Sequence, residues 1–414
     1  MGHCVTLIAI LSFLTLACFP HLSHAAAVPN VPVDNLVVFG DSYSDLGNFH
    51  RWTNGPVWSE NVAVAWNASL YSFAYTGSAC DNELYPHVPA TDRMPSIRDQ
   101  IELYYNLDLG LDANKTVFAI WVGITDIQKA YQQSLGTEDT QPDFGNIAKC
   151  IGQQVRNIRK AFKADRIMVF NVPPLEYMPF FVDDDNALDR AKWGAAAEQL
   201  NRMLRKDIAI LNRNHHALKL DLVDIHSLLS DIVEDPSMFS FTDASHAYLD
   251  ACQNQCDNKI DDYLWWDRTH MTGGAHRAIA NSILLSGSYA NPTSIDAWSL
   301  SQVQALIERP GSKYRSPIYV SPPNSGLIDR IVQEKTASSS SQGSFMSTLD
   351  NNTGHSMWSC VTIGGILAVL FGAIFKLLKK LRHQSNKHRF HGGLLDPNSV
   401  DAPYYYRSPM TEPK

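Results

Sequence analysis

The sequence is poor in charged residues, and basic ones are the scarcer kind. Asp, Glu, Lys and Arg make up 18% of the 414 residues, and 34 Lys and Arg face 42 Asp and Glu. With 45% apolar residues, most of the chain is expected to be globular rather than disordered. Residues 376–414 carry eight Lys and Arg against three Asp and Glu, so residues 1–375 have a net charge of −13 out of the total of −8. Because phosphate binding needs basic surface, this acidic body argues against nucleic acid as a partner.

Two segments lack charged residues altogether. The first, residues 4–19, precedes Pro20 and the run Ala25-Ala26-Ala27, a pattern typical of a secretory signal peptide. We therefore expect residues 1–27 to be a signal peptide, although Lys and Arg are missing before the apolar run. An uncleaved membrane anchor is the alternative, but the run is shorter than the ~20 residues that a span needs.

The second uncharged segment, residues 357–375, is close to the length of a bilayer span. Lys376, Lys379 and Lys380 follow it directly, as expected for a cytoplasmic flank. A buried core helix is the alternative. We expect a single-pass membrane protein of the secretory pathway, with its body extracellular or lumenal and residues 376–414 as a basic cytoplasmic tail.

Cysteine is also sparse. Three of the seven cysteines lie in the two apolar segments. The other four are Cys80, Cys150, Cys252 and Cys256. An even number in an exported domain predicts two disulfides, Cys252 with its near neighbour Cys256 and Cys80 with Cys150. The alternative is metal binding, but no second Cys pair or His pair stands at zinc spacing, so we expect no metal.

Three Asn-x-Ser/Thr triplets, beginning at Asn67, Asn114 and Asn351, are predicted glycosylation sites on an exported surface. Each triplet is short enough to occur by chance, so the prediction depends on the export signal.

Apolar runs separated by helical patterns predict an α/β fold. Strands are expected at residues 36–39, 117–122, 166–172 and 218–225. Helices are clearest at residues 188–211 and 273–285. Strands alternating with helices predict a doubly wound parallel sheet in a three-layer α/β/α sandwich over residues 28–287. Beyond it, Pro, Gly and Ser gather at 309–325 and Ser at 336–344, so residues 288–356 are predicted to be a flexible stalk.

A serine stands just past the first predicted strand. The run Leu36–Phe39 ends in Gly40-Asp41-Ser42, residue types that suit a tight turn. In open α/β sheets ligands bind outside the carboxyl ends of the strands, so Ser42 is placed to act as a nucleophile. A serine needs a base to take its proton, and the later segment Asp267-Arg268-Thr269-His270 offers one.

These segments resemble the conserved blocks of the SGNH (GDSL-type) esterases. Gly40–Asp45 resembles the first block, Gly77 the second, Gly123–Asp126 the third and Asp267–His270 the last. The resemblance implies a Ser-His-Asp triad of Ser42, His270 and Asp267 on a three-layer α/β/α fold, without metal or organic cofactor. It also implies an oxyanion hole of the Ser42 and Gly77 main-chain N–H groups and a third-block Asn, in whose place this sequence has Thr125.

Flanking residues narrow the resemblance to fungal acetylesterases of carbohydrate esterase family 16. The matching segments are Asn54–Trp58, Phe73–Tyr75, Cys80–Asn82 and Tyr263–Asp267. This likeness implies an acetylated carbohydrate as substrate, with four tryptophans near the motifs as candidate sugar platforms. They are Trp52, Trp58, Trp265 and Trp266. Trp265 and Trp266 are adjacent on an extended segment and are expected to point to opposite faces, one into the core.

The predicted protein is a membrane-tethered extracellular esterase that hydrolyses O-acetyl or short-acyl esters of carbohydrates through an acyl-enzyme. One alternative is a lipid or short-chain acyl esterase. Another is a weakly active wall-binding pseudo-esterase, because losing one oxyanion donor typically costs about 10²–10³ in rate. For Asp45 and Asp126, turn and cap bonding is preferred over support of the site.

Overall fold

The computed structural model describes residues 31–134, 142–182, 187–215, 218–252, 259–295 and 300–346. The chain divides into a compact unit that ends at Ser341 and a second unit, residues 342–414. The predicted signal peptide, Asn351, the predicted span at 357–375 and the basic tail lie outside the described residues. Within the described ranges, no helix has the length and apolarity needed to cross a membrane.

Five parallel strands form the main sheet in the order β2-β1-β3-β4-β5. Their bounds are β1 Asn35–Gly40, β2 Ser69–Ser72, β3 Thr116–Trp121, β4 Arg166–Phe170 and β5 Lys219–Val223. Four of them coincide with the strands expected from the sequence. The fifth, β2, was not predicted, because four residues that include two serines carry too short an apolar signal. All six residues of β3 are buried, as its place inside the sheet requires.

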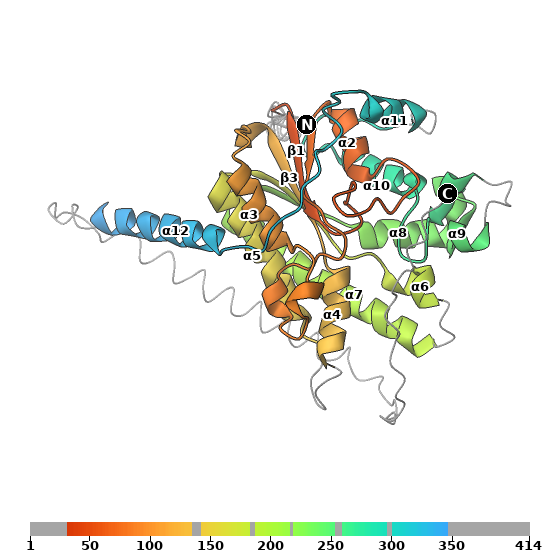
Figure 1. Ribbon diagram of the computed structural model, residues 1–414, viewed down its shortest axis with the longest axis horizontal. Coiled ribbons are helices and arrows are strands. Elements are labelled where there is room, and N and C mark those ends of the chain that lie inside the picture. Colours follow the sequence, from red (N-terminus) through yellow and green to blue (C-terminus); the bar gives the residue numbers. More distant parts are fainter. Residues whose placement is uncertain are drawn as a thin grey trace, which may run out of the picture. The chain divides into compact units, whose positions relative to one another are not determined.

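Helices cover both faces of this sheet, which confirms the predicted α/β/α sandwich (Figure 1). The helices are α2 Trp58–Trp66, α3 Ile97–Leu107, α4 Ile124–Ser134, α5 Phe144–Phe162, α6 Pro179–Val182, α7 Ala187–Asn214, α8 Ile225–Glu234, α9 Tyr248–Ala251, α10 Gly273–Ser286, α11 Leu300–Glu308 and α12 Leu327–Met346. Helix α5 packs against α3 and α7, whereas α2 packs against α10. A separate pair of parallel strands, β6 (Asp243–Ala247) and β7 (Tyr263–Trp265), lies beside α10.

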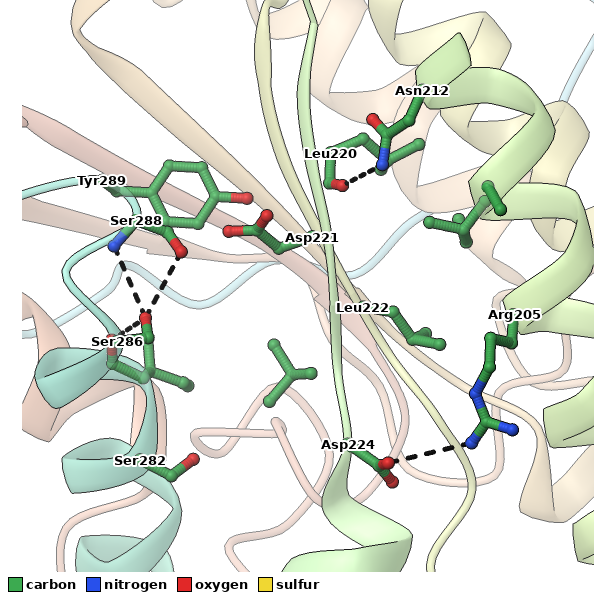
Figure 2. A pocket seen from close by; sticks show the side chains of 14 residues that line it. Arg205, Asn212, Leu220, Asp221, Leu222, Asp224, Ser282, Ser286, Ser288 and Tyr289 are labelled. Carbon is green, nitrogen blue, oxygen red and sulfur yellow. Dashed lines mark hydrogen bonds and ion pairs between the residues drawn. The ribbon is translucent and has the colours of Figure 1, made fainter. Parts of the chain in front are cut away.

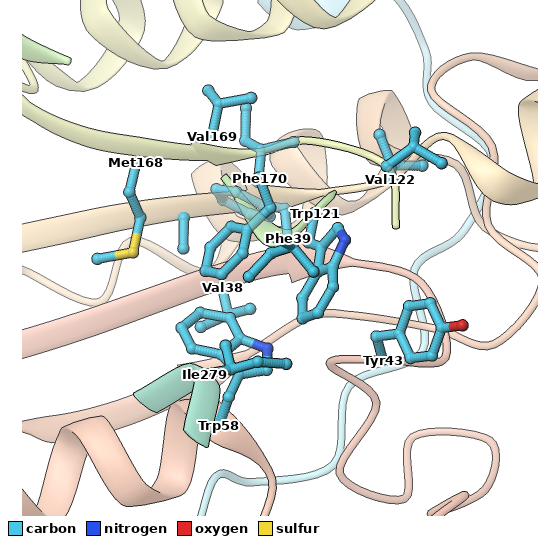
Figure 3. Packing of buried hydrophobic residues seen from close by; sticks show 14 of the residues in the cluster. Val38, Phe39, Tyr43, Trp58, Trp121, Val122, Met168, Val169, Phe170 and Ile279 are labelled. Atoms are coloured by element: carbon cyan, nitrogen blue, oxygen red, sulfur yellow. The ribbon is translucent and has the colours of Figure 1, made fainter. Parts of the chain in front are cut away.

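Aromatic side chains fill the core beneath the carboxyl ends of the strands (Figure 3). Trp121 stacks on Phe170 at 4.8 Å and on Tyr43 at 5.1 Å between ring centroids. Trp58 is fully buried beside them, and its Nε1 donates to the Ser44 hydroxyl. Trp58 therefore belongs to the core, which corrects its assignment as a candidate sugar platform.

The predicted flexible stalk is wrong over its described part, because residues 288–295 and 300–341 belong to the compact unit. Residues 309–326, which we call the strap, run along β2, where Leu70 N–H donates to the Lys313 carbonyl. The ring of Tyr319 stacks on Phe73 at 4.1 Å. Asp99 and Glu102 on α3 then accept main-chain N–H groups of Asn324, Ser325 and Leu327 at the end of the strap.

The strap satisfies polar groups that an edge strand would otherwise expose. The Pro- and Ser-rich composition predicted disorder because such a segment can bury little apolar surface. Composition does not show which main-chain hydrogen bonds a segment makes, and those bonds hold the strap. The globular domain therefore extends well past residue 287.

Candidate active site

Three of the predicted site residues follow three adjacent strands. Ser42 comes after β1, Gly77 after β2 and Thr125 after β3, at the start of α4. Since β1 lies between β2 and β3 and all three are parallel, their carboxyl ends meet at one edge of the sheet. The topology thus brings the first three motif blocks together.

The turn that carries Ser42 is held by the neighbouring strand. The N–H of Asp41 donates to the Trp121 carbonyl at the end of β3, and Ser44 N–H donates back to the Asp41 carbonyl. A Cβ on Gly40 would lie 2.9 Å from that same Trp121 oxygen, so only glycine allows the strands to approach this closely. The chain therefore turns sharply at Asp41, and the half-buried Ser42 lies beyond the strand.

The Asp267–His270 segment forms a tight loop between β7 and α10. Trp266 N–H donates to the His270 carbonyl, and the side chain of Thr272 caps α10 at the Ala275 N–H. Inside this loop, His270 Nδ1 lies 2.8 Å from Oδ2 and 3.0 Å from Oδ1 of Asp267. The loop therefore holds the imidazole by its Nδ1 edge.

Asp267 is kept as a carboxylate by this geometry. Its burial alone would raise the pKa, but the hydrogen bond and charge of His270 act against that. The main-chain N–H groups of Thr269 and His270 also donate to Oδ1, at 2.8 and 2.7 Å. Together they bring the pKa of Asp267 below its usual range, so the group is ionised at neutral pH.

A direct hydrogen bond links the Ser42 turn to the His270 loop. The hydroxyl of Tyr43, the residue after Ser42, donates to the Thr269 carbonyl at 2.6 Å. The Tyr43 ring also meets the His270 ring edge-on, with 5.9 Å between centroids. Residues more than 220 positions apart thus adjoin, and the structure brings Ser42 into the neighbourhood of the Asp267–His270 pair.

Asp45 ties the loop after β1 to the loop that carries Gly77. Its buried carboxylate accepts the main-chain N–H groups of Gly47 and Asn48, and it also accepts both the N–H and the hydroxyl of Thr76. The first two bonds are the turn bonding that was expected. The two bonds from Thr76 join the loop after β2 to the loop after β1. They fix the residue directly before Gly77, and Gly77 itself has a φ of +77°.

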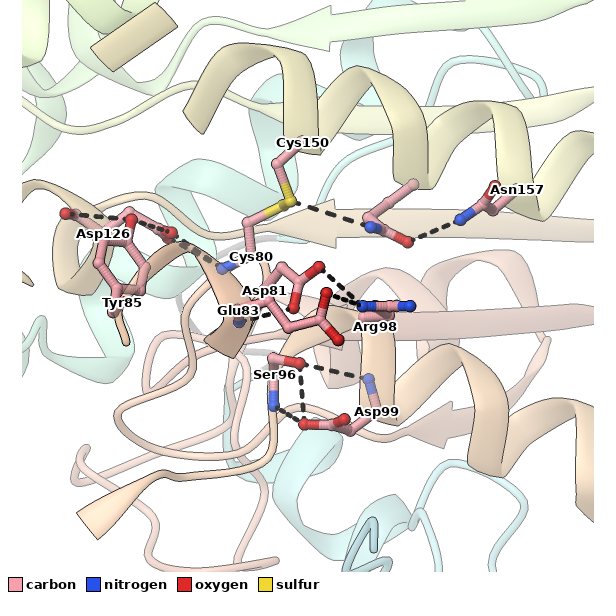
Figure 4. The surroundings of a disulfide bond; sticks show 11 residues. Cys80, Asp81, Glu83, Tyr85, Ser96, Arg98, Asp99, Asp126, Cys150 and Asn157 are labelled. Atoms are coloured by element: carbon pink, nitrogen blue, oxygen red, sulfur yellow. Dashed lines mark hydrogen bonds and ion pairs between the residues drawn. A yellow bond between two sulfur atoms is a disulfide. The ribbon is translucent and has the colours of Figure 1, made fainter. Parts of the chain in front are cut away.

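Asp126 bonds over a long range, which corrects the expectation of local capping. Its carboxylate accepts the Cys80 N–H at 3.0 Å and the Tyr85 hydroxyl at 2.8 Å. Cys80 is in turn bonded to Cys150 on α5, the disulfide expected from the sequence (Figure 4). The Gly77 loop is therefore anchored both to α4, next to Thr125, and to α5.

Two buried carboxyl groups beneath the site are hard to ionise. Burial raises the pKa of Asp41 to about 7, and the nearby charges of Asp126 and Asp45 add to the effect. Burial likewise raises the pKa of Asp126 to about 6, although its hydrogen bonds from Cys80 and Tyr85 oppose the shift. Deep burial costs a carboxylate more than these few bonds return.

The adjacent tryptophans on β7 and after it point to opposite sides, as expected. Trp265 is buried and its Nε1 donates to the Ala244 carbonyl, so it is not available to a sugar. Trp266 is half-buried and stacks on Tyr248 at 5.7 Å. Trp52 is also half-buried and lies directly on His270.

The remaining predicted residues are cysteines and glycosylation acceptors. Cys252 is disulfide-bonded, and its expected partner Cys256 lies outside the described residues. Asn67 and Asn114 are exposed, at the end of α2 and just before β3 respectively. Glycosylation at either position stays a prediction.

A groove of about 530 Å³ lies elsewhere, along the edge strand β5 between α7 and α10 (Figure 2). Asn212 Nδ2 donates to the Leu220 carbonyl on this edge, and Arg205 lies 3.8 Å from Asp224. None of the predicted site residues lines this groove, so it is separate from the Ser42 site.

Known proteins resemble this chain in sequence. A model of the GDSL-like Lipase/Acylhydrolase family matches residues 36–283. The chain belongs to this family. It is accordingly a carboxylic ester hydrolase of the SGNH (GDSL) type.

Individual relatives are distant. A thermolabile hemolysin of Vibrio parahaemolyticus is 23% identical over 64% of this chain and 66% of its own length. An acetylesterase of Hypocrea jecorina is 24% identical over 66% of this chain and 95% of its own. A putative GDSL-like lipase structure from Parabacteroides merdae aligns with a TM-score of 0.37 and 14% identity, over 63% of this chain and 97% of that one.

Proposed function

We propose that this protein is a serine esterase that removes O-acetyl or short-acyl groups from carbohydrates, with Ser42, His270 and Asp267 as its triad. The observation that carries the proposal is the Asp267–His270 pair, tied through Tyr43 to the strand-end turn that bears Ser42. In this proposal Ser42 is the nucleophile, His270 the base and Asp267 the carboxylate that orients the base.

The reaction runs through an acyl-enzyme. His270 takes the Ser42 proton through Nε2 as Oγ attacks the ester carbonyl, and then gives it to the departing alcohol. A water molecule, deprotonated by the same imidazole, next attacks the acyl carbon. The bond from that carbon to Ser42 Oγ then breaks, the imidazolium returns its proton to Oγ, and the acid leaves. Asp267 fixes the tautomer with the proton on Nδ1 and stabilises the imidazolium that forms.

Hydrogen-bond donors at the strand ends stabilise the negative charge that develops on the carbonyl oxygen. Within the described ranges, the main-chain N–H groups of Ser42 and Gly77 have no protein acceptor, which leaves both for that oxygen. In this proposal Thr125, which is half-buried at the start of α4, offers its hydroxyl in the position of the family's Asn. A β-branched hydroxyl reaches less far than an amide, so we expect a hole with two strong donors and one weak donor.

The substrate class rests on the likeness to the Hypocrea jecorina acetylesterase. Export, a C-terminal membrane span at 357–375 and an extracellular or lumenal catalytic domain belong to the same proposal, on the sequence features given above.

Substrate profiling of the full-length chain, alongside Ser42→Ala, tests this function. We expect Ser42-dependent hydrolysis of aryl acetate and of acetylated xylo-oligosaccharides, with rates falling from acetyl through butyryl to longer acyl esters. A preference for long acyl chains would replace the carbohydrate substrate with a lipid. No Ser42-dependent turnover on any acyl ester would favour the binding protein without activity.

A further inference from the structure

Trp52 lies flat on the ring of His270. The two rings are 4.9 Å apart between centroids and their planes differ by only 11°. No motif block contains Trp52, and its sequence position, ten residues after Ser42, gives no hint of this contact. The imidazole is therefore held by its edge through Asp267 and by its face through Trp52.

Trp52 is itself fixed by the loop that carries Gly77. Its Nε1 donates to the Thr76 hydroxyl at 2.9 Å, and that hydroxyl donates to Asp45 at 2.8 Å. The His50 ring packs edge-on against the indole at 4.4 Å. The indole thus spans from the loop of the proposed base to the residue that precedes the proposed oxyanion glycine.

We propose that Trp52 is a positioning residue. It fixes the plane of the His270 ring by stacking on its face, and it is itself held by the hydrogen bond to Thr76 on the loop that carries Gly77. The inference rests on the proposed function, since it assigns the imidazole as the base. Proton transfer between Ser42 and His270 depends on the angle of the imidazole plane as well as on its distance. A ring held only at Nδ1 can still tilt about that bond, and a misplacement of about 1 Å can cost 10²-fold in rate.

This role differs from that of a sugar platform. A platform residue contributes to substrate binding, so its loss raises KM on oligosaccharides and leaves small esters unaffected. A residue that positions the base lowers kcat on every ester, including one with no sugar, and leaves KM nearly unchanged.

Three variants of the full-length chain, assayed on p-nitrophenyl acetate, separate these roles. Trp52→Leu removes the ring, and we expect kcat to fall about ten- to a hundredfold with KM within about twofold. Trp52→Phe keeps an aromatic face but loses the N–H that bonds Thr76, so kcat should recover only in part, to about fivefold below wild type. Trp66→Leu is the matched control, because Trp66 is also half-buried but packs on Tyr289, away from the site; its kcat should not change.

The outcomes are distinct. The inference is overturned if wild type shows Ser42-dependent turnover but Trp52→Leu matches Trp66→Leu, or if Trp52→Phe is no better than Trp52→Leu. A wild-type chain without Ser42-dependent turnover overturns the proposed function, and the inference with it. If Trp52→Leu fails to fold, Thr76→Val decides: a fall in kcat at constant KM supports the role, and an unchanged kcat overturns it.

Discussion

The Tyr43 hydroxyl donates a 2.6 Å hydrogen bond to the carbonyl of Thr269. This bond joins the residue after the proposed nucleophile to the residue before the proposed base. Both partners are on loops, and the loops come from different sheets, so their relative position depends on such contacts. Burial and the nearby carboxylates of Asp41 and Asp267 raise the pKa of Tyr43 well above its usual value, so the hydroxyl remains a donor.

Tyr43→Phe should lower kcat about tenfold on aryl acetate, because the His270 loop loses its tie to the Ser42 turn. We also expect the free energy of unfolding to fall by about 1–2 kcal/mol, because a partly buried carbonyl loses its donor. Tyr289→Phe is the matched control. The Tyr289 hydroxyl also donates to a main-chain carbonyl, that of Ile167, over 2.7 Å, but neither residue belongs to the proposed site. Equal kcat losses in the two variants would show that the tie has no functional role.

Thr125→Asn should raise kcat, because a side-chain amide reaches farther toward the oxyanion than the threonine hydroxyl. The gain is bounded by the value of one oxyanion donor, about 10²–10³ in rate. Steady-state kinetics of the variant beside Thr125→Ala measure it. An unchanged or lower kcat in Thr125→Asn would mean that Thr125 already supplies an adequate donor.

The Cys80–Cys150 disulfide should stabilise the whole domain as well as the Gly77 loop. It closes a chain segment with a sequence separation of 70 residues, for which loop entropy predicts a contribution of about 4 kcal/mol. Chemical unfolding of Cys150→Ser against wild type measures the loss. A loss below about 1 kcal/mol would show that the anchoring through Asp126 is sufficient without the disulfide.

His276 on α10 should make the fold sensitive to acid. Burial, aided by the charges of Arg51 and His270, lowers its pKa to about 3 from the ordinary value of 6.5. The unfolded chain therefore binds this proton between pH 6.5 and about 3 while the folded chain does not. The contribution of His276 to stability should then decrease as pH falls through this window, by about 1.4 kcal/mol per pH unit, whereas the raised pKa values of Asp41 and Asp126 contribute in the opposite direction.

His276→Gln should flatten that slope, and its unfolding free energy can be measured at several pH values. His246→Gln serves as the control, because the His246 side chain is 68% exposed. Equal slopes in wild type and His276→Gln would contradict the assignment.

The assignment of Ser42, Asp267 and His270 to a triad came from local motifs, a strand-to-turn pattern and a three-residue spacing, and it stays a prediction. The structure adds that the two loops adjoin. The parallel sheet followed from alternating strands and helices. Three features escaped the same reasoning. Strand β2 is too short to show a period, the strap is held by main-chain bonds that composition does not report, and Asp126 bonds to residues more than 40 positions away.

The stacking of Trp52 on His270 is a further feature that the sequence did not predict. An aromatic residue on a loop gives no periodic signal, and only the folded chain shows which ring it meets. The parts of the site that depend on contacts between distant loops are thus the parts that needed the structure.

Covalent labelling of Ser42 tests the central claim most directly. The full-length chain is incubated with a fluorophosphonate, which traps a nucleophilic serine in an activated site, and the modified residue is identified by peptide mass mapping. We predict one adduct, on Ser42, whose formation slows at least 10²-fold in His270→Ala and is absent in Ser42→Ala. Labelling of another serine, or labelling of Ser42 at the same rate in His270→Ala, would contradict the account.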